Sequence, residues 1–347
     1  MTLAHGTPDP LAGMPVLVTG ATGKVGRLLV PVLVGRGAQV HLLTRDPERA
    51  RTFSGLAGAN CRAGDLTAPA SLPAALKGIS CVFHLASYSP TPEEPDIYEA
   101  PSHWPVTAEG TANLVQAAVV AGVERLVYLS SVKAMGDLVA ATGTPAEEGA
   151  LPAPESLYGR AKLAAEQSVL AAGTTARLHV CVLRLPMVYG LAGEGNIARM
   201  IEAVAKNRFP PWPKIENRRS AIHVRDAIAA ALLVATHPQA GGKTYLVTDG
   251  ASYSTRGLYE RIQGALGRDV PGWAVPRWVL GTAATMGTLL EKLSRRRMPL
   301  DREGLRKLTG DAWFSSERIR AELGFVPRHS LEEEIPRMVR EYLDGSR

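Results

Sequence analysis

The sequence predicts a doubly wound α/β fold, a parallel sheet with helices on both faces. Short apolar runs alternate with longer helical patterns along most of the chain before Gly190, as in repeated βαβ units. A glycine-rich turn separates the first apolar run from the first helical pattern. The 347 residues are 46% hydrophobic and 21% charged, which indicates a globular chain that is long enough to bury a large core.

The expected elements follow one another along the chain. The apolar runs predict strands at 14–20, 38–45, 81–87, 125–131 and 179–185. The helical patterns predict helices at 23–37, 110–122, 156–167 and 224–236. After Gly190 the alternation loosens. We therefore expect a flexible tail at 1–12, a first domain at 13–190 to which 219–238 returns, and a smaller domain formed mainly by 191–347 over the carboxyl ends of the strands.

Charge and cysteine content narrow the class of partner. The net charge of +6 favours an anionic ligand. No tract rich in lysine and arginine is interleaved with aromatic residues, so we expect a bound phosphate group and no nucleic acid. Cys61, Cys81 and Cys181 are too few, and odd in number, for a disulfide framework, which predicts a reducing cytoplasm as the setting.

Two stretches of the sequence bear on whether the chain has a signal peptide or a helix that spans a membrane. The first residues have neither the basic nor the apolar region of a signal peptide, which favours a short flexible tail. The apolar stretch 278–290 is much shorter than the roughly 20 residues that a spanning helix needs. Lys292 and Arg295 to Arg297 follow it, as in a basic helix that lies on anionic lipid, but a solvated helix face is the favoured interpretation.

The glycine-rich turn has the pattern of a dinucleotide site. Gly20, Gly23 and Gly26 follow the first strand and precede the first helix. Glycines allow a tight turn there and a close approach of the backbone to a pyrophosphate, and the helix N-terminus offers N–H groups to it. The turn therefore predicts a Rossmann-type nucleotide-binding domain.

The end of the second strand bears on the choice of dinucleotide. NAD sites usually have an acid there, but this chain has Thr44 and then Arg45, whose guanidinium suits the 2′-phosphate of NADP. The alternative is a solvated Arg45, with Asp46 capping the next helix. Asp65 follows a further strand and could accept from the adenine amino group, or it could cap its own turn.

Three side chains form a candidate acid–base group. Ser130 and Ser131 end the strand at 125–131, where parallel strands deliver residues to a ligand crevice. Tyr158 and Lys162 lie one helical turn apart on the next helix. A nearby ammonium lowers the pKa of a phenol, which would make Tyr158 an acid or base near neutrality. Ser131 would hydrogen-bond the substrate oxygen.

With these motifs the chain resembles the extended short-chain dehydrogenase/reductase family, of the NAD-dependent epimerase/dehydratase type, from about Met14 to the C-terminus. The similar segments are TGATGKVG, VFHLAS, LSSVKAMG, YGRAK and LRLPMVYG. The resemblance implies that Ser131, Tyr158 and Lys162 are catalytic, that Lys162 also holds the nicotinamide ribose, and that the protein is a homodimer. It also implies further NAD(P) contacts at Thr22, Lys24, Val25, Leu66, Leu85, Ala86, Ser87, Pro186 and Val188. One departure is Thr107, where the family usually has asparagine.

The segment NRRSAIHVRD at 217–226 bears on the substrate. It resembles a segment of nucleoside-diphosphate-sugar epimerases and dehydratases in which the arginine matching Arg219 clamps the diphosphate. Such a guanidinium suits bidentate capture of phosphate, although an ion pair across the domain boundary is the alternative. Ser130, Asn196 and His223 complete the predicted substrate contacts, and His223 is also explained by a structural role. We expect no metal.

Three hypotheses about function follow. The first is a UDP-sugar 4-epimerase with a retained dinucleotide. The second is an NADPH-dependent reductase of a 4-keto-sugar nucleotide or of an apolar, sterol-like or flavonoid-like ketone. It is favoured by Thr44 with Arg45, by Met187 where galactose epimerases have asparagine, and by the apolar stretch 278–290. The third is a cofactor-sensing binding protein, against which the intact Ser131, Tyr158 and Lys162 argue. The segment 217–226 places the epimerase slightly ahead of the reductase.

Overall fold

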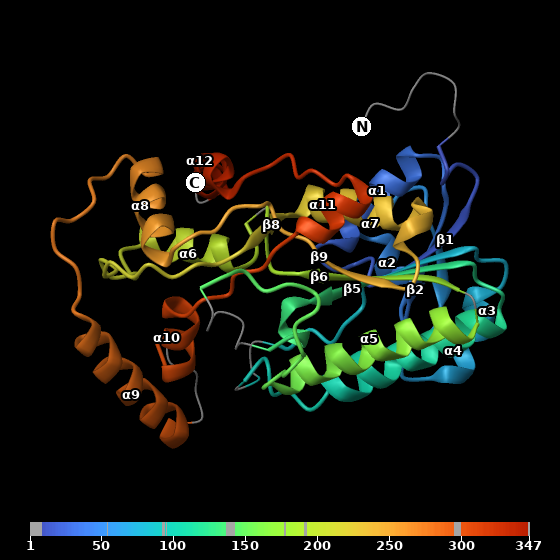
Figure 1. Ribbon diagram of the computed structural model, residues 1–347, viewed down its shortest axis with the longest axis horizontal. Helices are drawn as coiled ribbons and strands as arrows, with labels where there is room; N and C mark the ends of the chain where they lie inside the picture. Colours follow the sequence, from blue (N-terminus) through green and yellow to red (C-terminus); the bar gives the residue numbers. More distant parts are fainter. Residues whose placement is uncertain are drawn as a thin grey trace.

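The computed structural model describes residues 9–345, except 54, 92, 93, 95, 137–142, 177, 191, 192 and 295–299. Within these residues a seven-stranded parallel sheet has the order β3-β2-β1-β4-β5-β6-β9 (Figure 1). Its strands are β1 (Pro15–Thr19), β2 (Gln39–Thr44), β3 (Asn60–Ala63), β4 (Cys81–His84), β5 (Arg125–Ser131), β6 (His179–Leu185) and β9 (Lys243–Leu246). A second, small sheet pairs β7 (Met187–Tyr189) with β8 (Ala221–His223), also in parallel.

Helices connect the strands and extend beyond the sheet. The α-helices are α1 (Gly26–Gly35), α2 (Pro47–Arg51), α3 (Leu72–Leu76), α4 (Gly110–Val120), α5 (Leu157–Thr175), α6 (Asn196–Ala205), α7 (Val224–Thr236), α8 (Thr255–Ala265), α9 (Arg277–Ser294), α10 (Arg302–Thr309), α11 (Glu317–Leu323) and α12 (Leu331–Gly345). Short 3-10 or π turns are η1 (Pro69–Ser71), η2 (Trp104–Glu109), η3 (Val132–Ala134) and η4 (Pro238–Ala240). The predicted doubly wound α/β class is confirmed, since helices cover both faces of the parallel sheet (Figure 1).

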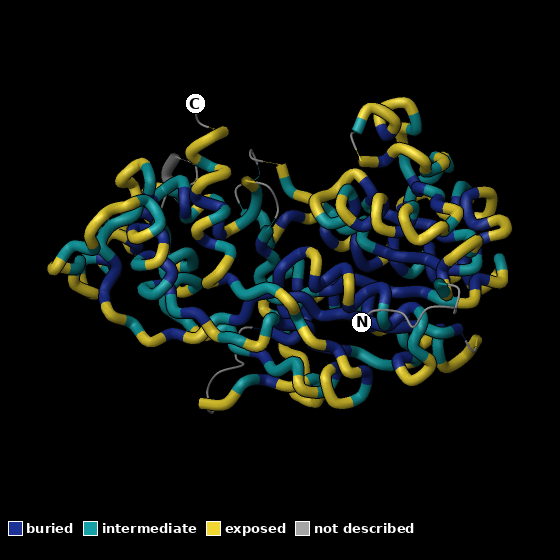
Figure 2. Tube along the Cα trace, turned by 90° about the horizontal axis from the view of Figure 1, so that it is seen from above, coloured by how far each residue is buried: buried dark blue, intermediate teal, exposed yellow. Residues whose placement is uncertain are grey.

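Alternation along the central strands builds the two halves of the core. On β5, Val127 and Leu129 belong to the cluster that includes α1, α7 and α11, while Leu126 and Tyr128 belong to the cluster that includes α3, α4 and α5. Successive side chains of a strand point to opposite faces, so a strand that is apolar on both faces is buried between two layers. Figure 2 shows this sheet as the buried centre of the larger part of the molecule.

A third apolar cluster lies beside the sheet and packs α6, α8 and α12 together. Trp212, Tyr259 and Ile335 are among its most buried members. The chain after residue 190 also contributes to the large sheet, because β9 pairs with β6 and the buried Ile319 of α11 joins the core above it. The domain boundaries stay a prediction, and the sheet receives more of the later chain than 219–238.

Every helix in the described ranges is too short or too polar to span a bilayer. Helix α9 includes the apolar stretch 278–290. It lies at the periphery, on the side of the molecule away from the sheet (Figure 1).

Candidate active site

The glycine turn after β1 packs closely against the protein's own backbone at Gly20 and Gly26. Gly20 has a φ of +69°, and a Cβ atom there would lie 2.7 Å from the Ala86 nitrogen. A Cβ on Gly26 would lie 2.3 Å from the Gly20 oxygen, whereas on Gly23 the nearest atom, the same oxygen, would be 3.1 Å away. Helix α1 begins without a side-chain cap. The turn and the helix N-terminus therefore fit a dinucleotide pyrophosphate.

The residues that bear on the choice of dinucleotide lie at the ends of β2 and β3. Arg45 is exposed after β2. Asp46 caps α2, since its Oδ1 accepts a hydrogen bond of 3.0 Å from the Arg49 N–H. Asp65 Oδ1 accepts hydrogen bonds from the N–H and the hydroxyl of Thr67. Asp46 therefore caps its helix and Asp65 caps its own turn, as the alternative interpretations of the sequence predicted.

The loop after β4 is fixed by three buried side chains. His84 joins Thr19 and Thr111, with 2.6 Å from its Nδ1 to the Thr19 Oγ1 and 2.8 Å from its Nε2 to the Thr111 Oγ1. The Ala86 N–H also donates to the Thr19 Oγ1. Ser87 Oγ lies 3.0 Å from the Oγ1 of Thr107, the position where the chain departs from the resembled family. Threonine therefore supplies a hydroxyl that holds Ser87.

Ser131 and Tyr158 come together at the end of β5. The Ser156 hydroxyl caps α5 by accepting from the Gly159 N–H at 3.1 Å, which places Tyr158 in the first turn. The ring of Tyr158 packs against Tyr98 and His103, with centroid distances of 5.9 and 5.0 Å.

The pKa of Tyr158 determines whether its phenol is protonated at neutral pH. Burial of the phenol raises its pKa to about 12, although the side-chain hydrogen bond with Ser131 lowers it and opposes that rise. At neutral pH Tyr158 therefore holds its proton and can donate it to a carbonyl oxygen.

Lys162 lies on α5, one helical turn after Tyr158. Its side chain is buried, and its Nζ donates to the Leu129 oxygen of β5 at 3.0 Å and lies 4.8 Å from the centre of the Tyr128 ring. Burial lowers the pKa of Lys162 to about 8, against the opposing effect of the Glu166 carboxylate. The expected lowering of the Tyr158 pKa is not what the structure shows, because desolvation of the phenol outweighs any effect of this ammonium.

Ser130 faces the helix layer, while Ser131 lines the pocket. The Ser130 hydroxyl donates to the Glu166 Oε1 at 2.5 Å. Glu166 is also held by Arg184, whose Nη2 donates to the Oε2 at 2.7 Å. All three side chains are buried between the sheet and α5. The predicted substrate contact of the Ser130 side chain is therefore corrected to a structural one, since alternate residues of a strand face opposite ways.

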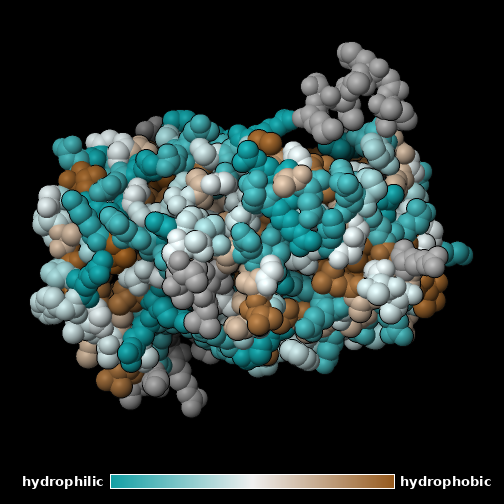
Figure 3. Space-filling view, viewed as in Figure 1, coloured by the Kyte–Doolittle hydropathy of each residue, from teal (hydrophilic) through white to brown (hydrophobic). Residues whose placement is uncertain are grey.

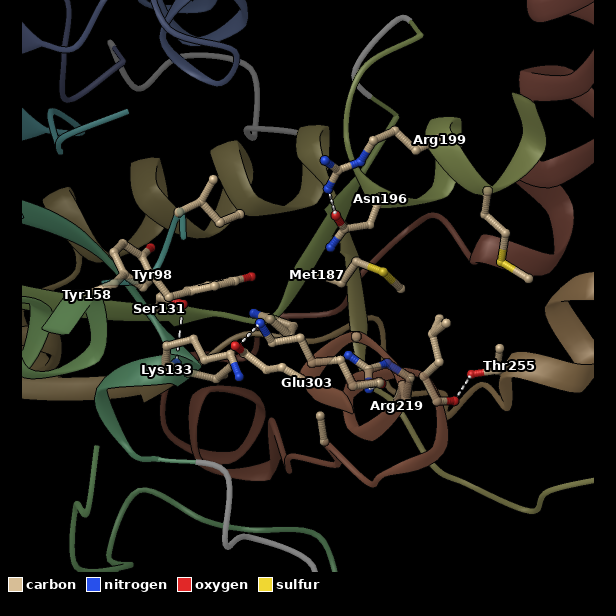
Figure 4. A pocket seen from close by; sticks show the side chains of 18 of the residues that line it. Tyr98, Ser131, Lys133, Tyr158, Met187, Asn196, Arg199, Arg219, Thr255 and Glu303 are labelled. Atoms are coloured by element: carbon tan, nitrogen blue, oxygen red, sulfur yellow. Dashed lines mark hydrogen bonds and ion pairs between the residues drawn. The ribbon is translucent and has the colours of Figure 1, made fainter. Parts of the chain in front are cut away.

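A pocket of about 1140 Å³ opens beside Ser131 and Tyr158. Of the residues that the sequence predicted, Ser131, Tyr158, Pro186, Asn196 and Arg219 line it (Figure 4). Its volume exceeds the 300–1,000 Å³ typical of sites for small ligands. The predicted catalytic pair and part of the predicted substrate set therefore share one cavity, while the side chains of Lys162, Ser130 and His223 lie outside its lining.

Arg219 is held in the pocket wall by backbone oxygens of α10. Its Nη1 donates to the Lys307 and Gly310 oxygens, at the C-terminal end of that helix, where cations are favoured. The main chain of Arg219 pairs with Tyr253. This arrangement presents a guanidinium at the pocket wall, where backbone oxygens hold it.

His223 has the structural role that its position favoured, whereas Asp226, expected to cap the helix at 224–236, instead binds the chain before α12. His223 is fully buried, its Nδ1 accepts from the Arg225 N–H, and its ring stacks on His329 at 4.1 Å. Burial lowers the pKa of His223 to about 4. Asp226 Oδ2 accepts from the Arg328 and His329 N–H groups and lies 3.1 Å from the His329 Nδ1.

One ligand atom each from His223, Asp226 and His329 lies within 4.8 Å of the others, so the described chain has one group that could approach a metal. The oxygen of Asp226 nearest to His329 already accepts from two backbone N–H groups. The expectation of no metal stays a prediction.

The sequence missed the second wall of the pocket. Tyr98 covers the Tyr158 ring and lies beneath the Nζ of Lys307, which is 3.8 Å from its ring centre. Lys307 also pairs with Glu303 on α10. These residues are far apart in the chain and fit no spacing pattern, so only the fold brings them to Tyr158. Lys133 was within reach of inference, since it follows Ser131 by two positions and lines the same pocket.

Comparison with known proteins agrees with this geometry. The model of the NAD dependent epimerase/dehydratase family matches residues 16–248. The UDP-glucose 4-epimerase of Vibrio cholerae is 26% identical over 98% of this chain and 99% of its own. The 2-alkyl-3-oxoalkanoate reductase of Stenotrophomonas maltophilia (strain K279a) is 29% identical over 94% of this chain and 98% of its own.

A solved structure is similar over nearly the whole length. MoeE5 in complex with UDP-glucose and NAD has a TM-score of 0.73 and 27% identity, and the match covers 96% of this chain and 100% of that one. Proteins of more than one activity thus share this architecture. The similarities support an NAD-dependent enzyme and leave its substrate to be argued from the pocket.

Proposed function

Because this chain belongs to the NAD-dependent epimerase/dehydratase family, of the extended short-chain dehydrogenase/reductase type, we propose that it is a UDP-sugar 4-epimerase. The observation that supports this most is the single pocket that joins Ser131 and Tyr158 to the Arg219 guanidinium. A sugar next to the phenol and a diphosphate next to the guanidinium would together use both ends of such a cavity.

The chain's own residues would perform the proton transfers at C4. NAD bound at the glycine turn would supply the acceptance and the return of hydride. In the return half, Tyr158 donates its proton to the ketone oxygen, which its pKa of about 12 favours at neutral pH. In the forward half Tyr158 must accept the C4 hydroxyl proton, which requires its pKa to fall. A positive charge beside a phenol lowers the pKa of the phenol. The hydrogen bond with Ser131 also lowers the pKa of Tyr158.

Two relatives support the nucleotide-sugar substrate. The Vibrio cholerae protein is named for epimerisation of UDP-glucose, and MoeE5 was solved with UDP-glucose and NAD. We propose NAD as the cofactor that the epimerase retains. Arg45, exposed at the end of β2, would then be solvated, and it would face a 2′-phosphate only if the cofactor were NADP.

The experiment is direct detection of C4 inversion. The purified protein is incubated with UDP-glucose or UDP-N-acetylglucosamine, and proton NMR follows the appearance of the C4 epimer without added cofactor. Mass analysis of the dialysed protein should find retained NAD. The Tyr158→Phe variant, with cofactor still bound, is the inactive control. If wild-type protein with NAD supplied leaves both sugars unchanged, the epimerase proposal fails for these substrates.

A second candidate is an NADPH-dependent ketone reductase. The proton held by Tyr158 suits donation to a ketone, and Met187, Met200 and Phe209 make much of the pocket wall apolar. The Stenotrophomonas maltophilia relative is named as a reductase of an alkyl oxoalkanoate. This candidate is tested by NADPH oxidation in the presence of 3-oxoalkanoates and sterol-like ketones. An empty purified site that binds NADPH more tightly than NADH would favour it over the epimerase.

A further inference from the structure

Between residues 278 and 290, helix α9 exposes only uncharged residues. The exposed positions from 278 to 290 are Trp278, Thr282, Ala283, Thr285, Met286, Leu289 and Leu290. Trp278 is 73% exposed, Met286 56% and Leu289 52%. Because these positions recur at helical spacing, they form one continuous surface, which we call the outer face of α9. Figure 3 shows hydrophobic atoms at the corner of the molecule where Figure 1 places this helix.

The opposite side of α9 accounts for its packing. Leu280 and Ala284 are buried there. Gly287 fits closely against the chain before α10, since a Cβ on it would lie 2.0 Å from the Leu300 oxygen. Thr288 and Glu291 line the pocket. Since this inner side already provides the contacts with the protein, the apolar outer face is not needed for the core.

The sequence of the segment that contains α9 has a strong excess of positive charge. From 270 to 297 the sequence has one acid, Glu291, and five basic residues, Arg277, Lys292, Arg295, Arg296 and Arg297. The acid is half-buried in the pocket wall, while Arg277 is exposed at the start of the helix. Trp273, 63% exposed, precedes it. An apolar helix face with tryptophan at its edge, in a segment whose sequence is basic, is typical of a helix that lies on an anionic membrane.

We propose that the outer face of α9, together with Trp273, docks on an anionic lipid bilayer, with the helix lying in the plane of the interface. A second copy of this chain fits less well, because the segment 270–297 has five basic residues and one acid in its sequence, so two such segments would repel each other. Docking through α9 would also place the pocket beside the bilayer, since Thr288 and Glu291 of the same helix line it.

The test is sedimentation of the full-length protein with vesicles. Vesicles of phosphatidylcholine alone are compared with vesicles that contain phosphatidylglycerol, at low and high salt. We expect the protein to pellet with the anionic vesicles, and to do so less at high salt. The double variant Trp278→Ser with Leu289→Ser should lose at least about tenfold in partitioning, because both side chains would enter the interface.

A matched double variant controls for the loss of any exposed apolar pair. Val120 and Leu151 are 81% and 92% exposed and lie outside α9, so Val120→Ser with Leu151→Ser should bind vesicles like wild type. Melting temperatures check that both variants fold. The proposal is overturned if wild type ignores anionic vesicles, or if both double variants bind equally well. It is also overturned if light scattering shows that the α9 variant instead separates a dimer into monomers.

Discussion

Tyr158 holds its proton because the surrounding protein desolvates the phenol more than Ser131 stabilises the phenolate. Its pKa of about 12 lies well above neutrality. We predict that Tyr158→Phe lowers kcat by about 10²- to 10⁴-fold, the usual contribution of a positioned acid or base. The dissociation constant for the cofactor should change little, as calorimetry can measure, because the variant keeps the glycine turn. Unchanged turnover would remove Tyr158 from the mechanism.

A variant at Arg219 tests whether the substrate has a diphosphate group. We predict that Arg219→Ala raises KM for a UDP-sugar far more than KM for an uncharged ketone, since only the UDP-sugar has a diphosphate for the guanidinium to bind. Arg218→Ala is the matched control, because that exposed guanidinium lies on the Trp313 ring. Steady-state kinetics on both substrates distinguishes them. An equal rise for both substrates would indicate that Arg219 acts by holding α10.

Two glycines of the turn between β1 and α1 are expected to have different roles, Gly26 in folding and Gly23 in dinucleotide binding. Alanine at position 26 meets backbone atoms at 2.3 and 2.6 Å, whereas alanine at position 23 meets only one oxygen, at 3.1 Å. We predict that Gly26→Ala lowers the melting temperature markedly, while Gly23→Ala leaves it near wild type and weakens dinucleotide binding at least about tenfold. Thermal unfolding and calorimetry measure the two effects. Equal melting temperatures for both variants would contradict the division.

The whole molecule has a pH dependence of stability set by buried histidines. Burial lowers the pKa of His84 to about 3 and that of His223 to about 4, below the unfolded value of 6.5. As pH falls from 6.5 toward 4, the unfolded chain binds protons that the folded chain refuses, so stability decreases. Each histidine contributes about 1.4 kcal/mol per pH unit in that window. Burial raises the pKa of Asp249 to about 6, which opposes this effect below pH 6.

Urea denaturation at pH 7.5 and 5.0 measures this change in the free energy of unfolding. We predict a net loss at the lower pH. The His84→Asn variant should show a smaller loss between the two pH values, even though its stability is lower at both because the contacts with Thr19 and Thr111 change. A wild-type free energy that is the same at both pH values, or an unchanged slope in the variant, would contradict the assignment.

The first half of the fold was predictable because its signals are local. The strand at 125–131 and the helix at 224–236 were expected at the bounds that the structure has. Strand β9 was not predicted. It has only four residues, it begins with a lysine, and it lies at the edge of the sheet. Short edge strands have little of the apolar run that identifies a buried strand.

The homodimer and the cytoplasmic setting stay predictions.

The sequence by itself determined the doubly wound class, the position of the glycine turn and the pairing of Ser131 with Tyr158, because each depends on spacing within one strand–turn–helix unit. Only the tertiary structure decided what surrounds them. Lys162 donates to the Leu129 oxygen, burial raises the pKa of Tyr158, and α10, from far along the chain, holds Arg219. Desolvation and contacts between distant segments depend on the packed fold as a whole, so no local pattern encodes them.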